Sequence, residues 1–255
     1  MIICTLIWGA GFLTLKHLQK EVPQRTGARL YQNGTQGHKL NNRILGDKAG
    51  ALQSLFALWA IDQALDAYPP MFLKSQGPNI LLANQLSLLG HPISGTVQIR
   101  PPKSWVILAS NYLLPSLDLQ FMRRTFHHEF SSILIANTPF PHSDWEATLP
   151  AGFSFPKTDQ ERLEALQDYP SAAEMDVIYA RGFVAGYGRS SQENDINTYA
   201  ELLLDAPVEL VNLASRYPAI AKKAALISGF YKSLDPSFKI SNFTTLNHLP
   251  SSQSK

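Results

Sequence analysis

The residues whose types and spacing could do chemistry lie in the segment HHEFSS, where His128 and Glu129 are followed by Ser132. Two histidines four residues apart on a helix share one face and can bind zinc, and a Glu after the first His can take a proton from the metal-bound water. Here Ser132 stands where the second His would be. The segment therefore raises the hypothesis of a hydrolytic metal site with an altered ligand set.

A second polar segment, ENDINTYAELL, lies further along the chain and carries Asn197 and Glu201 four residues apart. This spacing places both side chains on one face of a predicted helix. A His-Glu pair on a helix is common by chance, and its plain interpretation is a solvated His beside a solvated Glu. The metal-site hypothesis therefore depends on the two segments together.

Taken together, HHEFSSIL and GFVAGYGRSSQENDINTYAELLL resemble the motifs of a bacterial family of zinc-binding metallopeptidases, which usually read His-Glu-Phe-x-His-Ile and Glu-Asp-Phe-Ala-Glu. That family is distantly similar to the catalytic domain of anthrax lethal factor. The resemblance covers roughly residues 45 to 235. It implies an α+β, gluzincin-like fold, a zinc cofactor and hydrolysis of peptide bonds.

The resemblance also implies roles for individual residues. His128 matches the first zinc ligand, Glu129 matches the general base, and Tyr187 in GFVAGYG matches a tyrosine that assists the oxyanion. Glu201 matches a supporting carboxylate. Asn197 stands where the family has its Glu ligand, so this residue and Ser132 are both departures from the family pattern.

Three explanations of this ligand set remain open. In the first, the site recruits other metal ligands, drawn from His127, His142, Asp195, Asn197 and Glu201. Adjacent histidines point about 100° apart on a helix, so His127 and His128 do not easily face one ion. In the second, the chain is a pseudo-peptidase that binds a peptide or protein. In the third, His128, Glu129 and Glu201 act without metal.

A metal-free hydrogen-bond network between helices is the structural alternative. In it, His128 donates to Glu201 and Asn197 satisfies Ser132. Buried carboxylates without partners cost several kcal/mol, so these polar groups must be paired, hydrated or metal-bound.

The composition is that of a folded protein, with 255 residues of which 45% are hydrophobic and 16% charged. A net charge of +2 and the lack of a basic run predict no nucleic-acid partner. We expect Arg216, Lys222 and Lys223 to form a solvated helix face. Cys4 is the one cysteine, which excludes an internal disulfide and thiolate-based zinc sites. Zinc would need His, carboxylate or amide ligands.

Residues 1–20 form an apolar leader, in which no charge occurs before Lys16. A membrane span needs about twenty residues, and the uncharged run is shorter than that. Its length suits the apolar region of a secretion signal. No positive residues precede it. We expect an export signal or weak anchor rather than a buried first element, and therefore an exported or membrane-associated protein, with a cytoplasmic location as the alternative.

Hydrophobic periodicity predicts one domain over residues 21–255. A helix is expected to begin at Asp47 and end at Tyr68, and a second to begin near Pro115 with Ser116 as its cap or in its first turn. Between them, the apolar runs NILLA, GTVQI and WVILA predict a small sheet. A small sheet followed by several helices is an α+β arrangement.

The second half of the chain is predicted to be helical after a proline-rich loop over residues 138–157. Trp145 and its aromatic neighbours are expected to be packing of that loop. Helices are expected at 159–166, from Asn194 or Asp195 onward, at 207–213 and at 217–232, and 167–193 is expected to be a long connection. The partner expected for this domain is a peptide or protein, as substrate or ligand.

Overall fold

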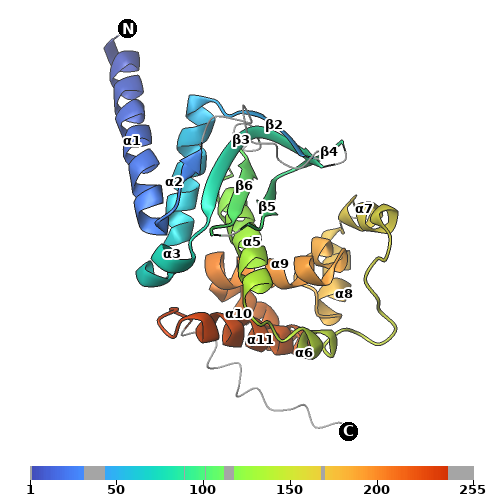
Figure 1. Cartoon of the computed structure of the whole chain (residues 1–255). Helices are drawn as coiled ribbons and strands as arrows, with labels where there is room; N and C mark the ends of the chain where they lie inside the picture. The colour runs from blue at the N-terminus through green and yellow to red at the C-terminus, as the bar shows by residue number, and fades with distance from the viewer. Residues whose placement is uncertain are drawn as a thin grey trace. The chain divides into compact units, whose positions relative to one another are not determined.

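The computed structural model describes residues 2–31, 44–88, 90–100, 102–111, 118–167 and 170–240 (Figure 1). The chain divides into two compact units, Met1–Ala136 and Asn137–Lys255, and each is described by itself. Unit 1 contains the sheet, and the elements described in unit 2 are all helical. The α+β class, with strands before a series of helices, is confirmed.

The sheet of unit 1 is organised around one long strand, β3 (Asn79–Leu88). β3 pairs in parallel with β1 and β6 and antiparallel with β2 and β4. β5 pairs antiparallel with β6 and ends the sheet among the described strands. The remaining bounds are β1 Leu30–Tyr31, β2 Ile44–Lys48, β4 His91–Ile93, β5 Gly95–Gln98 and β6 Trp105–Ala109.

The three predicted strands are confirmed, because NILLA lies in β3, GTVQ forms β5 and WVILA forms β6. Continuous apolar runs suit strands that are buried on both faces. Leu81 and Ala83 of β3 and Ile107 and Ala109 of β6 belong to one buried cluster. The neighbouring β5 is only partly buried along its length.

Among the described residues of unit 1, four helices lie or begin: α1 (Ile2–Thr26), α2 (Ala51–Leu65), α3 (Pro70–Gln76) and α5 (Leu119–Asn137). α2 contacts both α1 and β3, and Figure 1 shows it between them. The predicted start of this helix at Asp47 is wrong, since Asp47 lies in β2 and Gly50 caps α2. The hydrophobic pattern does not predict α3. The expected start of α5 near residue 115 lies outside the described residues.

Lys103 ties together the ends of two helices. Its Nζ donates to the carbonyl oxygens of Thr26 (3.1 Å) and Gly27 (3.0 Å) at the end of α1, and of Gly77 (3.3 Å) after α3. Carbonyls at a helix C-terminus lack intrahelical partners and carry partial negative charge, so an ammonium group is favourable there. The end of α1 is thereby fixed to the body of unit 1.

We predict that Lys103→Met lowers the free energy of unfolding by about 1.5–3 kcal/mol, because several carbonyls lose a charged donor. Urea denaturation followed by circular dichroism measures this. Lys74→Met is the matched control, since its side chain is exposed at the end of α3. Equal effects of the two substitutions would contradict this role of Lys103.

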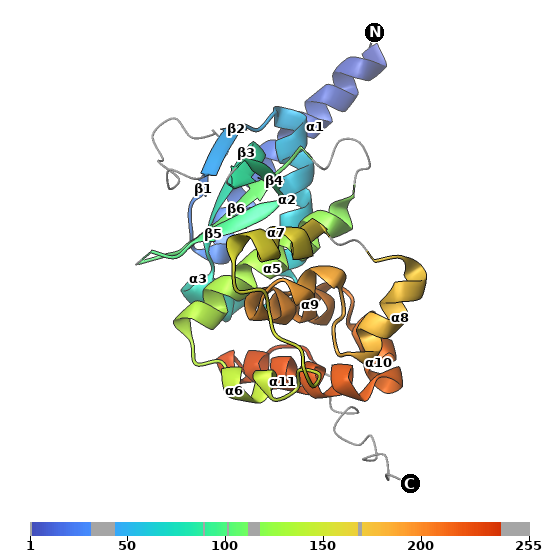
Figure 2. The same cartoon turned by 90° about the vertical axis from the view of Figure 1, so that its right-hand side faces the viewer.

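The helices of unit 2 are α6 (His142–Glu146), α7 (Asp159–Gln167), α8 (Ala172–Ala180), the 3-10 helix η1 (Gly186–Arg189), α9 (Gln192–Asp205), α10 (Pro207–Arg216) and α11 (Pro218–Leu234). α6 and α11 lie side by side (Figure 2). The predicted loop at 138–157 contains α6, and the long connection contains α8 and η1. Ser191, rather than Asn194 or Asp195, caps α9 by accepting from the Asn194 N–H.

Candidate functional site

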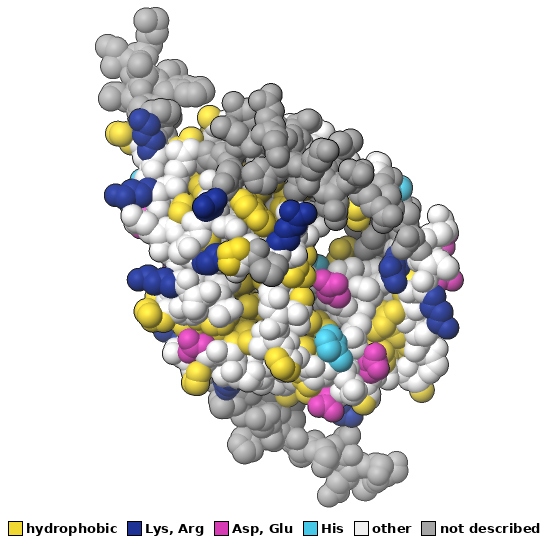
Figure 3. All heavy atoms as spheres, viewed as in Figure 1, with side chains coloured by type: hydrophobic (Ala, Val, Ile, Leu, Met, Phe, Trp, Pro, Cys, Tyr) yellow, Lys and Arg dark blue, Asp and Glu magenta, His cyan; other side chains and the backbone are white. Residues whose placement is uncertain are grey.

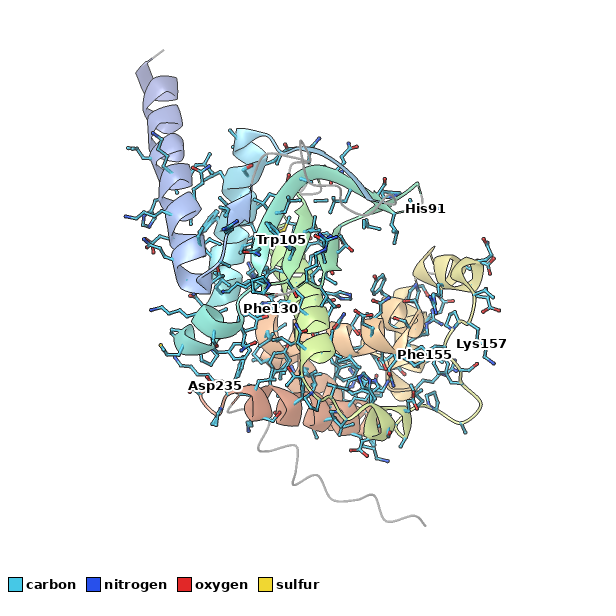
Figure 4. All side chains as sticks on the ribbon, in the orientation of Figure 1. His91, Trp105, Phe130, Phe155, Lys157 and Asp235 are labelled. Atoms are coloured by element: carbon cyan, nitrogen blue, oxygen red, sulfur yellow. The ribbon has the colours of Figure 1, made fainter. Side chains whose placement is uncertain are left out.

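The two histidines of α5 face different surroundings. His127 is buried and its Nδ1 lies 2.8 Å from the Tyr68 hydroxyl. Its ring also neighbours Phe126, and Tyr68 packs on Phe130, which Figure 4 labels on α5. His127 is therefore part of the core of unit 1. His128 points about 100° away from it and shares a face with Ser132, one turn along the helix.

His128 and Ser132 are both buried, and the His128 residue is 8% exposed. Their common face is the one on which a His-Glu-x-x-His helix would hold a metal. The helix thus gives positions 128 and 132 the spacing that this motif requires. What differs is the donor at position 132, a hydroxyl in place of an imidazole.

Glu129 lies directly against the backbone of the end strand β5. A Cβ added at Gly95 would come within 2.8 Å of Glu129 Oε1 and 2.9 Å of its Cγ, and within 2.9 Å of Thr125 Cγ2. These distances are too short for ordinary contact, so only glycine lets α5 approach β5 this closely. Gly95 was not among the residues that the sequence motifs pointed to. A glycine within a predicted strand can signal a close approach of this kind.

We predict that Gly95→Ala destabilises the chain by about 1–3 kcal/mol, because the added methyl group forces Glu129 and Thr125 away from β5. The double variant Gly95→Ala/Glu129→Ala lacks the Glu129 atoms that the new methyl group would meet, so it should recover part of the lost stability. Chemical denaturation measures both effects.

Gly229→Ala is the control for this prediction, because Gly229 lies in α11 and an added Cβ would meet nothing within 4 Å. Alanine at a helical glycine of this kind should leave stability unchanged or raise it. A Gly95→Ala variant as stable as the native chain would contradict the close approach.

In unit 2, Asp195 of α9 and Lys223 of α11 form a fully buried ion pair. Lys223 Nζ lies 2.6 Å from Asp195 Oδ2, and both side chains are 0% exposed. Trp145 Nε1 donates to the same carboxylate oxygen at 2.8 Å, and Lys223 also donates to the Gly182 carbonyl at 2.8 Å. The pair thus connects α6, α9, α11 and the turn after α8.

Burial raises the pKa of Asp195 to about 6, although Lys223 and the Trp145 indole partly offset this effect. Burial likewise lowers the pKa of Lys223, and Asp195 opposes that shift. The expectation that Lys223 lies on a solvated face is wrong. Its helix face is the one that carries buried Ile220, Ala224 and Ile227, so the lysine points into the core of unit 2.

We predict that Lys223→Met destabilises the chain by roughly 3–5 kcal/mol, since it leaves the Asp195 carboxylate buried without its counter-charge. The double variant Asp195→Asn/Lys223→Met should regain much of this loss, because it removes both charges. Urea titration of the two variants measures the difference. A double variant no more stable than Lys223→Met would contradict the ion-pair explanation.

The ion pair determines which residues lie on the other side of α9. At about 100° per residue, Asn197 and Glu201 point roughly 200° and 240° from Asp195, away from Lys223. Asn197 is buried and Glu201 is partly exposed. Asn197 and Glu201 therefore share one face of α9, as the spacing predicts. Asp195 lies on the opposite side of the helix.

The remaining predicted residues of unit 2 lie elsewhere. His142 Nδ1 is 3.0 Å from Gln192 Oε1 in the first turn of α9, and Glu201 is about 13 Å further along that helix. The structure therefore does not bring His142 and Glu201 together. Tyr187 lies in η1 and is 43% exposed. The roles assigned to these residues stay predictions.

The donors at the predicted ligand positions do not fit zinc well. Protein zinc sites use Cys, His, Asp and Glu, and Ser132 and Asn197 offer a hydroxyl and an amide instead. Within the described ranges, no group of three or more His, Cys, Asp and Glu side chains could hold a metal ion. The assignment of His128, Asn197, Glu201 and His142 as ligands therefore stays a prediction.

Trp145 is part of the core, as predicted. It is fully buried and contacts Phe140 and Tyr199, with ring centroids 5.7 and 5.3 Å away. Lys223 Nζ lies 4.3 Å from the centroid of the Phe183 ring, so the aromatic groups around the ion pair surround the chain's own ammonium group.

Comparisons with known proteins found a similar fold among solved structures and no match in sequence. No protein-family model matches the chain, and a search of curated proteins found no match. Among solved structures, the chain is similar to "a putative zinc-binding metallo-peptidase from Bacteroides caccae ATCC 43185", with a TM-score of 0.55 and 18% sequence identity. The similarity covers 94% of this chain and 95% of that one. At this identity it shows a common fold, and the finer gluzincin and lethal-factor relationships stay predictions.

Proposed function

We propose that this chain binds peptides on a fold like that of a zinc metallopeptidase, with an extended peptide adding to the sheet beside β5. The observation that carries the proposal is the contact of Glu129 with Gly95, which puts a carboxylate at the end strand of the sheet. An end strand can accept a peptide through main-chain hydrogen bonds.

The ladder between β5 and β6 indicates which backbone groups would receive the peptide. The Ala109 N–H donates to the Ser94 carbonyl at 2.8 Å, so residue 94 points toward β6. Because these directions alternate along an antiparallel strand, the N–H and C=O groups of Gly95 and Val97 point away from β6. They are the groups that would pair with a bound peptide.

Glu129 would supply charge recognition next to this edge. A carboxylate accepts hydrogen bonds from a peptide N–H or from a basic side chain, and such charge-assisted bonds are stronger than neutral ones. His128 lies at the adjacent position of the helix. In this proposal the two residues orient the peptide.

Peptide-bond hydrolysis is the second candidate. It is favoured by the retained order of His128 and Glu129 on α5 and by the fold of a neighbour whose description includes zinc binding. In this version zinc would be held by a set drawn from His128, Asn197 and Glu201, with Tyr187 near the oxyanion. His142 would not take part, because it lies beside Gln192 in the first turn of α9. The hydroxyl of Ser132 and the amide of Asn197 weigh against it.

We predict that Val97→Pro weakens peptide binding because it removes an outward N–H without removing a bond to β6. Val97→Ala is the control, since it keeps that N–H. Glu129→Gln should weaken binding of basic peptides most, and Glu146→Gln, at an exposed position in unit 2, should not.

The measurement for these variants is selection from a random peptide library, followed by mass spectrometry of bound and cleaved species. Recovery of intact peptides supports the binding proposal, and new termini that disappear in Glu129→Gln support hydrolysis. If the Val97→Pro variant bound peptides as tightly as the native chain, pairing with β5 would be ruled out.

The altered ligand set can be tested by restoring it. We predict that Ser132→His/Asn197→Glu gains zinc, because it returns the family's ligands to the positions that resemble theirs. Ser131→His/Asn197→Glu is the control, since position 131 points about 60° to the other side of His128. Zinc titration with a competing chelator measures affinity, and no gain over this control would contradict the assignment of the positions.

A further inference from the structure

α1 is a single helix whose two halves differ in chemistry. Ile2–Leu15 carries no charge, and Lys16, His17 and Lys20 follow it. The helix runs without interruption from Ile2 to Thr26. No described helix is long and apolar enough to cross a membrane.

The second half of α1 is part of the fold of unit 1. Leu15, Leu18 and Val22 are buried, and α1 contacts α2. Arg25 forms ion pairs with Asp62 and Asp66 of the α2 region, each at 2.7 Å. Removal of a leader that ended between residues 15 and 22 would therefore take packing residues away from unit 1.

We infer that α1 stays attached and docks this protein on an anionic lipid surface. Its uncharged run is about 21 Å long at 1.5 Å per residue, which is shorter than the hydrocarbon core of about 30 Å. The run enters the lipid from one side and does not cross it. This inference is independent of the proposed peptide binding.

The exposed surface of α1 has the charge that such a lipid surface requires. Leu13 is 70% exposed, and Lys16, His17 and Lys20 are exposed within an arc of about 100° that includes it. Figure 3 shows Lys and Arg side chains along the edge of the molecule that α1 forms. Lysines directly after an apolar run reach the lipid phosphates, and each contributes about 1 kcal/mol near an anionic surface.

The sequence of the uncharged run favours lipid over a second copy of this chain. Apolar residues fill IICTLIWGAGFLTL almost continuously and do not recur at helical spacing. A helix that pairs with one partner needs one apolar stripe, whereas a helix surrounded by acyl chains is apolar all round. Lipid is therefore the occupant that fits this segment.

The test uses Cys4, the single cysteine of the chain, as the site for a polarity-sensitive fluorophore on the full-length protein. Vesicles of pure phosphatidylcholine are compared with vesicles containing one quarter phosphatidylglycerol. We expect a blue shift and protection from an aqueous quencher, with tighter binding to the anionic vesicles.

Lys16→Glu/Lys20→Glu should weaken binding to the anionic vesicles by about tenfold or more. Lys157→Glu/Lys222→Glu, which changes two exposed lysines of unit 2 by the same charge, should not. Lys157, which Figure 4 labels, belongs to unit 2, whereas α1 belongs to unit 1.

Three results would overturn the inference. The first is no change at Cys4 with either vesicle. The second is a blue shift that depends on protein concentration without vesicles, which would mean association of two copies. The third is a mature chain whose N-terminus, measured by mass spectrometry after expression in bacterial cells, begins beyond Leu15.

Discussion

The buried ion pair of Asp195 and Lys223 sets the orientation of α9, and with it the chemistry that unit 2 can present. Because both charged groups are buried, the Asp195 carboxylate must face the Lys223 ammonium group. This requirement fixes the rotation of α9 about its own axis. That rotation turns Asn197 and Glu201 to the opposite side. On α5, the contact of His127 with Tyr68 has the same effect, because it leaves His128 and Ser132 on a different face. In both helices a core polar contact determines which residues can form a site.

The site on α5 keeps the shape of a metal-binding helix with different donors. By resemblance to the metallopeptidase motif, His128 and Glu129 match its first ligand and its base, and position 132 carries a hydroxyl. Gly95 allows Glu129 to lie against the end strand of the sheet. The proposed peptide binding needs a strand edge and a carboxylate, which β5 and Glu129 supply among the described residues. Zinc chemistry needs further nitrogen or carboxylate donors, and those positions carry neutral oxygen donors.

Sequence patterns predicted the elements whose signal is local. NILLA and WVILA are continuous apolar runs, and both proved to be buried strands. α3 was missed because it is short and begins at Pro70, directly after Pro69. α8 was missed although most of its residues are apolar, because it has only nine residues. The start of α2 was misplaced because Asp47, an acidic residue of the kind that often begins a helix, is still in strand β2.

The contacts that define the site could not be predicted in the same way, because they join residues far apart in sequence. Lys223 follows another lysine and appears solvated in its local context, yet its partner is on a different helix. Gly95 is an unremarkable strand glycine until Glu129 is placed against it. The motif residues were found because their spacing is that of one helical turn, which is a local property.

The zinc affinity of the native chain, purified without a histidine tag, tests the central claim most directly. Metal analysis and titration with a competing chelator would give both the zinc content and its affinity. The account predicts little bound zinc and only weak affinity, since Ser132 and Asn197 replace strong ligands. Near one tightly bound zinc per chain, lost in His128→Ala, would contradict it and establish a rebuilt metal site.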